Sequence, residues 1–474
     1  MATKNGQSKV FAFILITFLF FLWGAITSIN DVLIAIYQDL HGLSEVQSMY
    51  ILLAFFGAYG IGSFAYYLYS QKNGDPINKL GYKRGILMGL LVAGIGCTSL
   101  YPITATGNYY ACLTSFFIIG LGLTLLQISC NPYIAILGPE ESSSSRLNLS
   151  QGFNSLGTTI GPLAAGYLIL SYASKNAAIQ ELYLYCGIVF FAFALLLWAI
   201  TLPDYRSEEN NTKTTGSALQ FSHLRAGMIA IFFYVGAEVM IGGKIMQYVQ
   251  LPEIGDLTDN DAASYLGIYW GGAMIGRLGI SVISSPKFNL LKKALYGLLT
   301  ITLTYLSIVL FITLKTKILE MGQPFEWAII SNAYQETFSE IQPILLFIVI
   351  QFIFMLVFRN SSRTLLAVFS GIIILALLLA FWFEGKVALW SILSIGLFNS
   401  IMWSNIFTLS ISGLKEHTSQ GSSLLIIMII GGAILPLGMG GVSDLSGSIK
   451  IGFLFPIISY LYILHFGLFG SKTN

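Results

Sequence analysis

The sequence predicts an all-α protein that crosses a membrane about fourteen times, and three observations predict this class. Of the 474 residues, 55% are hydrophobic and only 10% are charged, whereas a soluble domain carries about 25% charged residues. The 24 Lys and Arg residues nearly balance the 22 Asp and Glu residues, which leaves no basic field for nucleic acid. The apolar residues form runs long enough to span a bilayer, where helices satisfy the backbone internally.

Fourteen apolar runs are the candidate membrane spans. Short loops that contain Lys, Arg, Pro or Gly separate them, and the run at 341–358 is the shortest. The predicted spans lie near 10–37, 46–70, 84–104, 109–137, 150–172, 182–202, 224–250, 262–284, 288–314, 341–358, 363–383, 386–412, 420–442 and 450–470.

The distribution of Lys and Arg predicts the orientation of these spans. Cytoplasmic loops of membrane proteins hold an excess of both residues. With both termini in the cytoplasm, 17 of the 24 basic residues fall on the cytoplasmic side, five fall outside and two fall within spans. Omitting either 288–314 or 341–358 alone would invert every later loop, so both are spans or neither is. We therefore expect a multi-pass protein of a cell membrane, most simply the bacterial inner membrane, with both termini cytoplasmic.

Weak internal similarity indicates that the chain is duplicated, as in many transporters. The run Phe20-Phe21-Leu22-Trp23-Gly24 resembles Phe232-Phe233-Tyr234-Val235-Gly236, at an offset of 212. Cys130-Asn131 resembles Ser404-Asn405 at an offset of 274, and Ser150-Gln151-Gly152 resembles Ser419-Gln420-Gly421 at 269. The increase of 62 between the first two offsets indicates an insertion in the second half.

The duplication predicts two six-helix bundles with an extra hairpin. The N-terminal bundle covers 1–202, a polar cytoplasmic linker covers 203–223, and the C-terminal bundle covers 224–474 with the hairpin at about 288–358. The loop 315–340 inside this hairpin is expected to lie outside the membrane. It contains Glu320, Glu326, Glu336 and Glu340.

Two carboxylates lie well inside apolar runs, Asp31 and Glu238. A charge within a span costs at least about 2.5–3.5 kcal/mol on insertion scales, so each requires an explanation. Asp31 shares a helical face with Gly24, Thr27 and Ser28, and such a stripe faces protein or water rather than lipid. Either carboxylate could instead be a structural partner of Lys244 or Arg277.

Amide and aromatic side chains in the spans form a pattern that suits a sugar. Amides donate and accept hydrogen bonds, and aromatic rings stack on the C–H faces of sugars. The alternative is that an amide only joins neighbouring helices, which is worth about 0.6 kcal/mol. The candidate sugar-binding residues are Gln127, Asn131, Gln151, Asn154, Tyr234, Trp270 and Asn399.

Asp31 and Glu238 are also the candidate proton carriers. A carboxylate in apolar surroundings holds a proton that it can release when water or a cation reaches it. The chain has no phosphate-binding Gly-x-x-x-x-Gly-Lys-Ser/Thr loop, and its four histidines lack metal-ligand spacing. We therefore expect no catalytic residues, no metal and no cofactor, with a proton gradient as the energy source and Na⁺ as the alternative.

Several long motifs resemble the fucose-permease family of the major facilitator superfamily, most closely its glucose/galactose transporter branch. The resemblance covers nearly the whole chain except about 288–358. The motifs are Phe20-Phe21-Leu22-Trp23-Gly24, Asn30-Asp31-Val32-Leu33-Ile34, Asn131-Pro132-Tyr133, Gln151-Gly152-Phe153-Asn154-Ser155, Phe233-Tyr234-Val235-Gly236-Ala237-Glu238, Tyr269-Trp270-Gly271-Gly272-Ala273-Met274, Gly276-Arg277 and Phe398-Asn399-Ser400-Ile401-Met402-Trp403.

The resemblance implies the major facilitator fold and sugar–proton symport by alternating access. It assigns Asp31 as the essential aspartate of span 1, and Gln151 and Asn154 as sugar-contacting amides. Gln127 stands where fucose permease has a glutamate, and Glu238 matches a glutamate of the glucose/galactose branch. These departures favour glucose or galactose over fucose.

The same resemblance suggests gating residues. Lys83 and Arg84 resemble a degenerate form of the superfamily loop between spans 2 and 3, which latches the inward gate. We assign Lys83, Arg84 and Arg277 to gating.

The most economical hypothesis is therefore a monomeric, proton-coupled hexose importer whose partners are a small sugar and the lipid bilayer. A Na⁺-coupled transporter, or one for N-acetylglucosamine or fucose, is the alternative within the fold. A membrane-embedded enzyme or a sugar sensor is the alternative of another class. The enzyme would need a nucleophile or metal cluster that the sequence lacks, and the sensor would need a long cytoplasmic segment.

Overall fold

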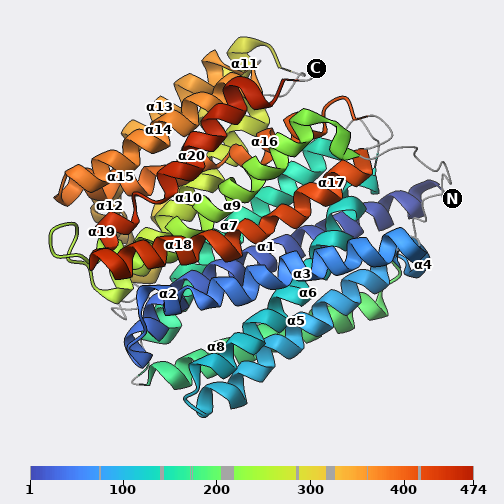
Figure 1. Ribbon diagram of the computed structural model, residues 1–474, viewed down its shortest axis with the longest axis horizontal. Helices are drawn as coiled ribbons and strands as arrows, with labels where there is room; N and C mark the ends of the chain where they lie inside the picture. Colours follow the sequence, from blue (N-terminus) through green and yellow to red (C-terminus); the bar gives the residue numbers. More distant parts are fainter. Residues whose placement is uncertain are drawn as a thin grey trace.

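The computed structural model describes residues 2–73, 76–138, 143–170, 172, 174–203, 218–283, 288–316, 326–359, 361–414 and 418–472. Helices run side by side along the long axis, and α1 begins and α20 ends at the same end of the molecule (Figure 1). No strand occurs in these ranges. The predicted all-α class is confirmed.

The first half contains eight helices. Long apolar runs form α1, α3, α5, α6 and α8, while short α2 and α4 follow the ends of α1 and α3. The bounds are α1 Ala2–His41, α2 Glu45–Ser48, α3 Tyr50–Asn73, α4 Pro76–Leu80, α5 Tyr82–Ala105, α6 Tyr109–Ile136, α7 Ser143–Leu170 and α8 Lys175–Ala199.

The second half is longer and more often interrupted. Its helices are η2 Ala218–Gln220, α9 Ser222–Val249, α10 Asp259–Ile283, α11 Leu290–Thr313, α12 Trp327–Ile341, α13 Ile344–Val357, α14 Ser362–Trp382, α15 Gly385–Asn399, α16 Met402–Ile411, α17 Thr418–Ile427, η5 Met428–Ile430, α18 Gly431–Ser446, α19 Ile449–Gly452, α20 Pro456–His465 and η6 Phe466–Gly470. Most of the predicted linker, 204–217, lies outside the described residues.

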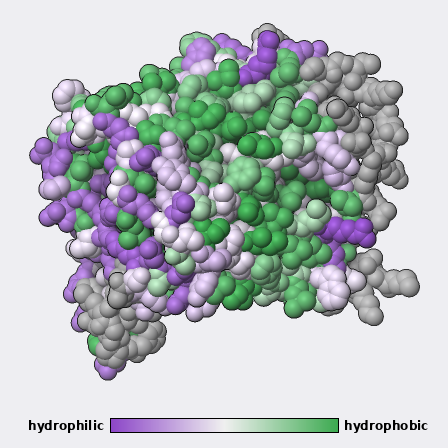
Figure 2. All heavy atoms as spheres, turned by 60° about the horizontal axis from the view of Figure 1, so that its bottom comes forward, coloured by the Kyte–Doolittle hydropathy of each residue, from purple (hydrophilic) through white to green (hydrophobic). Residues whose placement is uncertain are grey.

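Twelve helices in the described ranges are long and apolar enough to cross a membrane, and a bent pair makes a thirteenth span if it is counted as one. A broad hydrophobic surface crosses the molecule, with hydrophilic residues gathered toward one end (Figure 2). The fifth predicted span is present as α7 but is not among the twelve. Its sequence is comparatively polar because it packs between α1 and α10.

The predicted extra hairpin contains a helix that the sequence analysis did not predict. The segment 315–340, expected to lie outside the membrane, includes helix α12, which bends by 66° into α13, while residues 317–325 lie outside the described residues. Helices α12 and α13 are long and apolar enough to cross a membrane only when the bent pair is taken together. The glutamates suggested a polar loop, but α12 is an amphipathic helix whose buried side chains recur at helical spacing. These are Ile330, Ala333, Thr337 and Ile341.

The packing order of the first half recurs in the second. Helix α5 packs against α6 and α8, and α14 packs in the same way against α15 and α20. Likewise α3 packs against α6, and α10 packs against α15. Helices α11–α13 have no counterpart in the first half and pack on the outside of α10 and α15.

The halves meet where α7 packs on α10, α1 on α9, and α3 on α18. Within the first half, glycines bring α1 and α7 into backbone contact. A Cβ at Gly157 would overlap the carbonyl oxygen of Phe21, and one at Gly24 would overlap the carbonyl oxygen of Asn154. This close approach holds one face of α7 against α1, while the other face of α7 packs on α10.

We predict that Gly157→Ala lowers the thermal stability of the purified protein. The added methyl group would overlap backbone atoms of α1, which cannot move aside as a flexible side chain can. Such overpacking lowers the free energy of unfolding by about 1–3 kcal/mol. The matched control is Gly371→Ala in α14, where a Cβ meets nothing within 4 Å. Thermal unfolding in detergent measures both. Equal melting temperatures for the two variants would contradict the packing argument.

Candidate functional site

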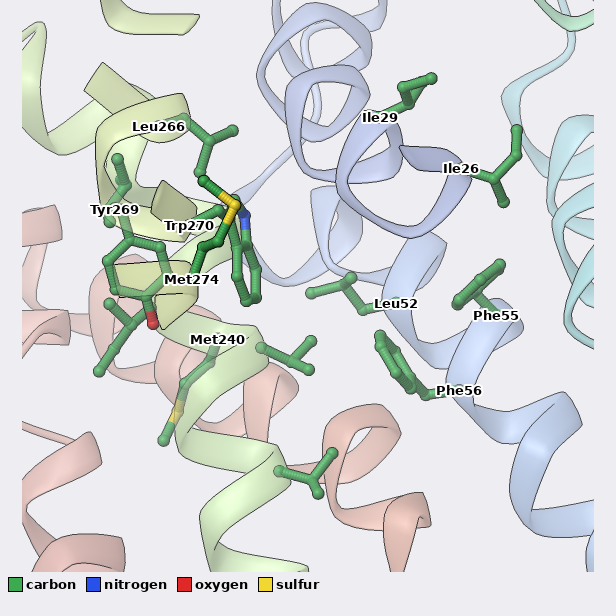
Figure 3. Packing of buried hydrophobic residues seen from close by; sticks show 14 of the residues in the cluster. Ile26, Ile29, Leu52, Phe55, Phe56, Met240, Leu266, Tyr269, Trp270 and Met274 are labelled. Carbon is green, nitrogen blue, oxygen red and sulfur yellow. The ribbon is translucent and has the colours of Figure 1, made fainter. Parts of the chain in front are cut away.

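Asp31 of α1 joins the two halves in the interior of the molecule. Its side chain is only 4% exposed, and its Oδ2 accepts a hydrogen bond of 3.1 Å from the indole N–H of Trp270 on α10. Trp270 packs edge-on against Tyr269, with 5.1 Å between ring centroids. In Figure 3, both rings lie beside Met240 and Met274, with Leu52 and Phe56 of α3 close by. Among the described residues, the carboxylate in these apolar surroundings accepts a hydrogen bond from one N–H donor, which belongs to the other half.

The small-residue stripe of α1 divides between two neighbours. Ser28 faces α7, since a Cβ at Gly161 would overlap its hydroxyl, whereas Asp31 faces α10. Gly24 also faces α7, and Thr27 donates to the carbonyl of Trp23 within α1. Gly24, Ser28 and Asp31 of the predicted polar face are thus buried against protein, and the carboxylate of Asp31 contacts the second half.

Glu238 of α9 lies beside a cation. The Nη2 of Arg277 on α10 is 3.6 Å from its Oε1, and the Nη1 of Arg277 donates to the hydroxyl of Ser155 on α7 over 2.7 Å. Arg277 therefore connects an acidic residue of its own half to a hydroxyl of the first half. The pairing with Arg277 considered as an alternative for Glu238 is present, whereas Lys244 pairs with neither candidate carboxylate.

Asn399 is the centre of a buried cluster of tyrosines. Its amide nitrogen donates to the Tyr269 hydroxyl over 3.3 Å, and its Oδ1 accepts from the Tyr460 hydroxyl over 2.9 Å. The Tyr234 hydroxyl donates to the Asn399 carbonyl over 3.4 Å. Since Tyr269 also donates to the carbonyl of Glu238 over 3.3 Å, the cluster extends to the acidic residue of α9.

The predicted amides of the first half differ in their contacts. Asn154 donates to the carbonyl of Phe20 over 3.0 Å and so joins α7 to α1. Gln127 and Asn131, one turn apart on α6, each bury a side-chain oxygen that has no hydrogen-bond partner among the described residues. Gln151 is half-buried on α7. No hydrogen bond between described residues joins Gln127 or Asn131 to Asp31 or Trp270.

The candidate gating residues lie apart from one another. Lys83, at the start of α5, donates to the carbonyls of Trp198 and Ile200 over 3.1 and 2.6 Å, so it caps the end of α8 in its own half. Arg84 is exposed. Arg277 is the one of the three that contacts the opposite half.

The end of the molecule opposite the chain termini is closed by polar contacts between the halves (Figure 1). Lys244 of α9 is fully buried, lies 2.5 Å from Glu45 Oε2, and donates to Gln38 and Ser48 over 2.8 Å each. The carboxylate of Asp444 on α18 accepts the backbone N–H groups of Glu45 and the next residue over 2.8 and 3.0 Å. Opening this end requires breaking all of these contacts together.

Sequence reasoning missed several members of this arrangement. Tyr460 sits in an apolar run rich in tyrosine and phenylalanine, where no signal distinguishes it. Tyr269 precedes a candidate residue and could have been added by its place in the same motif. The role of Lys244 stayed open because its partners lie about two hundred positions away in the chain. Trp403 is half-buried and stacks on Phe407, with 6.2 Å between centroids.

The side chains of this arrangement are of the kinds that bind a polyhydroxylated ligand and a proton. Tyrosine hydroxyls, two amides with buried free oxygens and an indole ring supply donors, acceptors and a stacking surface. Asp31 is a buried carboxylate, and Arg277 is a fixed donor between the halves. Within the described residues, no group of three His, Cys, Asp or Glu side chains could hold a metal ion.

The comparisons with known proteins agree on one superfamily. Residues 16–342 match a sequence model of the Major Facilitator Superfamily. The glucose/galactose transporter of Brucella abortus biovar 1 (strain 9-941) is 36% identical over 479 residues, which cover 99% of this chain and 97% of that protein. The L-fucose-proton symporter of Escherichia coli (strain K12) is 26% identical over 499 residues, covering 99% and 95%.

Solved structures show the same similarity. FucP, a Major Facilitator Superfamily transporter solved in the outward conformation, is 26% identical with a TM-score of 0.63, and the match covers 98% of this chain and 100% of that chain. A bacterial homologue of the human lysosomal transporter Spinster, in an inward-facing and unoccupied conformation, is 12% identical with a TM-score of 0.64, over 98% and 97%. The latter similarity concerns the fold alone.

We predict that Lys244→Met opens the closed end more often. With the four native cysteines replaced, an Ile34→Cys thiol should react at least about fivefold faster with a membrane-impermeant maleimide, because one partner of a buried ion pair is missing. The contacts of Lys244 with Glu45, Gln38 and Ser48 are called the Lys244 network. Ile34 is fully buried beneath this network, and its side chain lies close to Gly243.

The matched control is Lys175→Met at the same end. Lys175 pairs with Asp259 over 3.1 Å, but both side chains are about one-third exposed, and exposed pairs contribute little. Equal labelling rates in wild type and Lys244→Met would show that the Lys244 network does not hold this end closed.

Proposed function

Because the chain belongs to the Major Facilitator Superfamily, we propose that it imports a hexose, glucose or galactose, by proton symport and alternating access. The glucose/galactose transporter of Brucella abortus matches it over nearly the full length of both proteins. The observation that carries the mechanism is the hydrogen bond between Asp31 and Trp270, because it links a buried carboxylate to the relative position of the two halves.

We propose that the face opposite the termini is the extracellular face. The chain is a multi-pass membrane protein, and 17 of its 24 Lys and Arg residues lie in loops on the side of the termini when both termini are cytoplasmic. The Lys244 network then closes the outer gate. In this orientation Gln127 and Asn131, in the last third of α6, line the cytoplasmic half of the path.

Sugar binding is proposed to use both halves. Trp270 offers its ring for stacking, and Asn399 with its tyrosines offers hydroxyl and amide groups. The buried oxygens of Gln127 and Asn131 can accept hydrogen bonds from sugar hydroxyls. Gln151 is proposed as a further sugar contact, and Asn154 as a residue that orients α7 against α1.

Coupling to protons is proposed to depend on Asp31. When the halves rock, the Trp270 N–H moves away from the carboxylate, which then needs either a proton or water to compensate for the lost donor. A protonated Asp31 can return through the closed state without carrying a charge. Glu238 is the second candidate, and its charge is balanced by Arg277 in the present conformation.

We predict that Asp31→Asn abolishes sugar accumulation driven by a proton gradient but preserves exchange of sugar down its own gradient. The amide mimics the protonated acid, so the halves can still rock while no proton is released. Accumulation in proteoliposomes should fall at least about tenfold, equivalent to a loss of about 1.4 kcal/mol of coupling. The control is Asp39→Asn, an exposed carboxylate on the same helix. Undiminished accumulation by Asp31→Asn would exclude this coupling role.

Substrate choice is predicted to follow the glucose/galactose relatives. Excess unlabelled galactose should reduce labelled-glucose uptake about tenfold, whereas L-fucose and N-acetylglucosamine should leave it nearly unchanged, because unpaired polar groups in a built site reject analogues strongly. Uptake is measured in transport-deficient cells at fixed pH with and without Na⁺. Stronger competition by fucose, or a requirement for Na⁺, would select one of the alternative transport functions.

A further inference from the structure

The inserted helices reach the centre of the second half through one side chain. Helix α13 has the sequence ILLFIVIQFIFMLV, in which Gln351 is the single polar residue. Its neighbours along the helix are apolar, as expected for a segment that packs among lipid and other helices. Gln351 itself is fully buried and faces the contact between α13 and α15.

Gln351 meets a break in the span Gly385–Ile411. Helix α15 ends at Asn399 and α16 begins at Met402, so the regular ladder of backbone hydrogen bonds is interrupted. The Gln351 amide nitrogen donates to the carbonyl of Leu397 and to the hydroxyl of Ser400, the latter over 3.2 Å. The Leu397 carbonyl also accepts the backbone N–H of Ser400 over 3.3 Å, so Gln351 is its second donor and joins α13 directly to the residues of the break.

The first half provides an internal comparison. At the offset of 274, the break at Ser400 and Ile401 corresponds to Leu126 and Gln127 in α6, which continues unbroken from Tyr109 to Ile136. The first half also has no helices in the place of α11–α13. The break and the side chain that contacts it therefore occur together, in the half that carries the insertion.

The break lies directly beside the candidate sugar site. Asn399, the last residue of α15, holds Tyr269 and Tyr460 through its side chain. On the other side, a Cβ at Gly276 would overlap the Ser400 hydroxyl and the Gln351 amide, so the backbone just before Arg277 packs against this contact. Gln351 thus touches the structure that orients Asn399 without reaching the tyrosines itself.

The amide is poorly explained by packing alone. Its Oε1 is buried and has no hydrogen-bond partner among the described residues, an arrangement that costs free energy relative to an apolar side chain of the same size. Its Nε2, in contrast, has two acceptors. The donor function accounts for a glutamine at this position.

We propose that Gln351 is a positioning residue for sugar binding, through which the inserted helices hold the α15–α16 break and so set the orientation of Asn399. This inference rests on the proposed hexose transport. It gives the insertion a role in affinity for the sugar rather than in membrane anchoring alone.

The test is calorimetric titration of purified protein with galactose. Gln351→Leu removes the donor at similar volume and should raise the dissociation constant about three- to tenfold, as expected when a hydrogen bond is lost. Val349→Leu, on the exposed face of the same helix, should leave it unchanged. Gln351→Met serves if the leucine variant does not reach the membrane.

A double-mutant cycle with Tyr460→Phe separates positioning from general stability. Both changes act on Asn399, so their effects on the dissociation constant should combine to less than their product. An unchanged constant in Gln351→Leu, or effects that multiply fully, would overturn the inference. A wild-type protein that binds no hexose would instead contradict the proposed function, which distinguishes the two failures.

Discussion

The hydrogen bond between Asp31 and Trp270 expresses the constraint on which the structure depends: polar groups buried in a membrane protein must find partners inside it. In this chain several of those partners belong to the opposite half. Arg277 reaches Ser155, and Lys244 reaches Glu45, in each case across the interface between the halves. A movement of one half against the other therefore breaks or changes the contacts of these buried polar groups, and so changes their free energy.

This arrangement holds one end of the described structure closed. The face opposite the termini is closed by an ion pair, two amide or hydroxyl acceptors and a capped helix, all of which must separate for it to open. Buried side-chain oxygens without hydrogen-bond partners among the described residues occur toward the termini, in Gln127 and Asn131, and also near the closed end, in Gln247 and Asn260. Hydroxyl groups of a ligand could satisfy such acceptors at the positions that it reaches.

Much of the fold could be predicted because membrane insertion leaves a local signature. Runs of apolar residues predicted the helices, and the rare carboxylate Asp31 indicated a buried contact, which the structure places between the two halves. The partners could not be predicted, because contacts such as that between Lys244 and Ser48 join positions remote in sequence. Helix α12 was missed because its polar face suggested a loop, although the spacing from Ile330 to Ile341 is helical. Tyr460 carries no local signal, whereas Gln351 is a lone amide in an apolar run, a signal that the sequence analysis did not use.

The insertion illustrates how a peripheral addition can become part of a binding site. Helices added at the lipid-facing side disturb little, because exposed apolar residues such as Leu291 and Leu303 of α11 suit lipid as well as protein. Helix α13 reaches the break in a neighbouring span through Gln351, which donates to the Leu397 carbonyl and to the Ser400 hydroxyl. Leu397 belongs to the last turn of α15, and Ser400 directly follows Asn399. Because one side chain of the inserted helix contacts both residues, a shift of this helix would move the backbone that carries Asn399, and the peripheral addition becomes part of what orients the site.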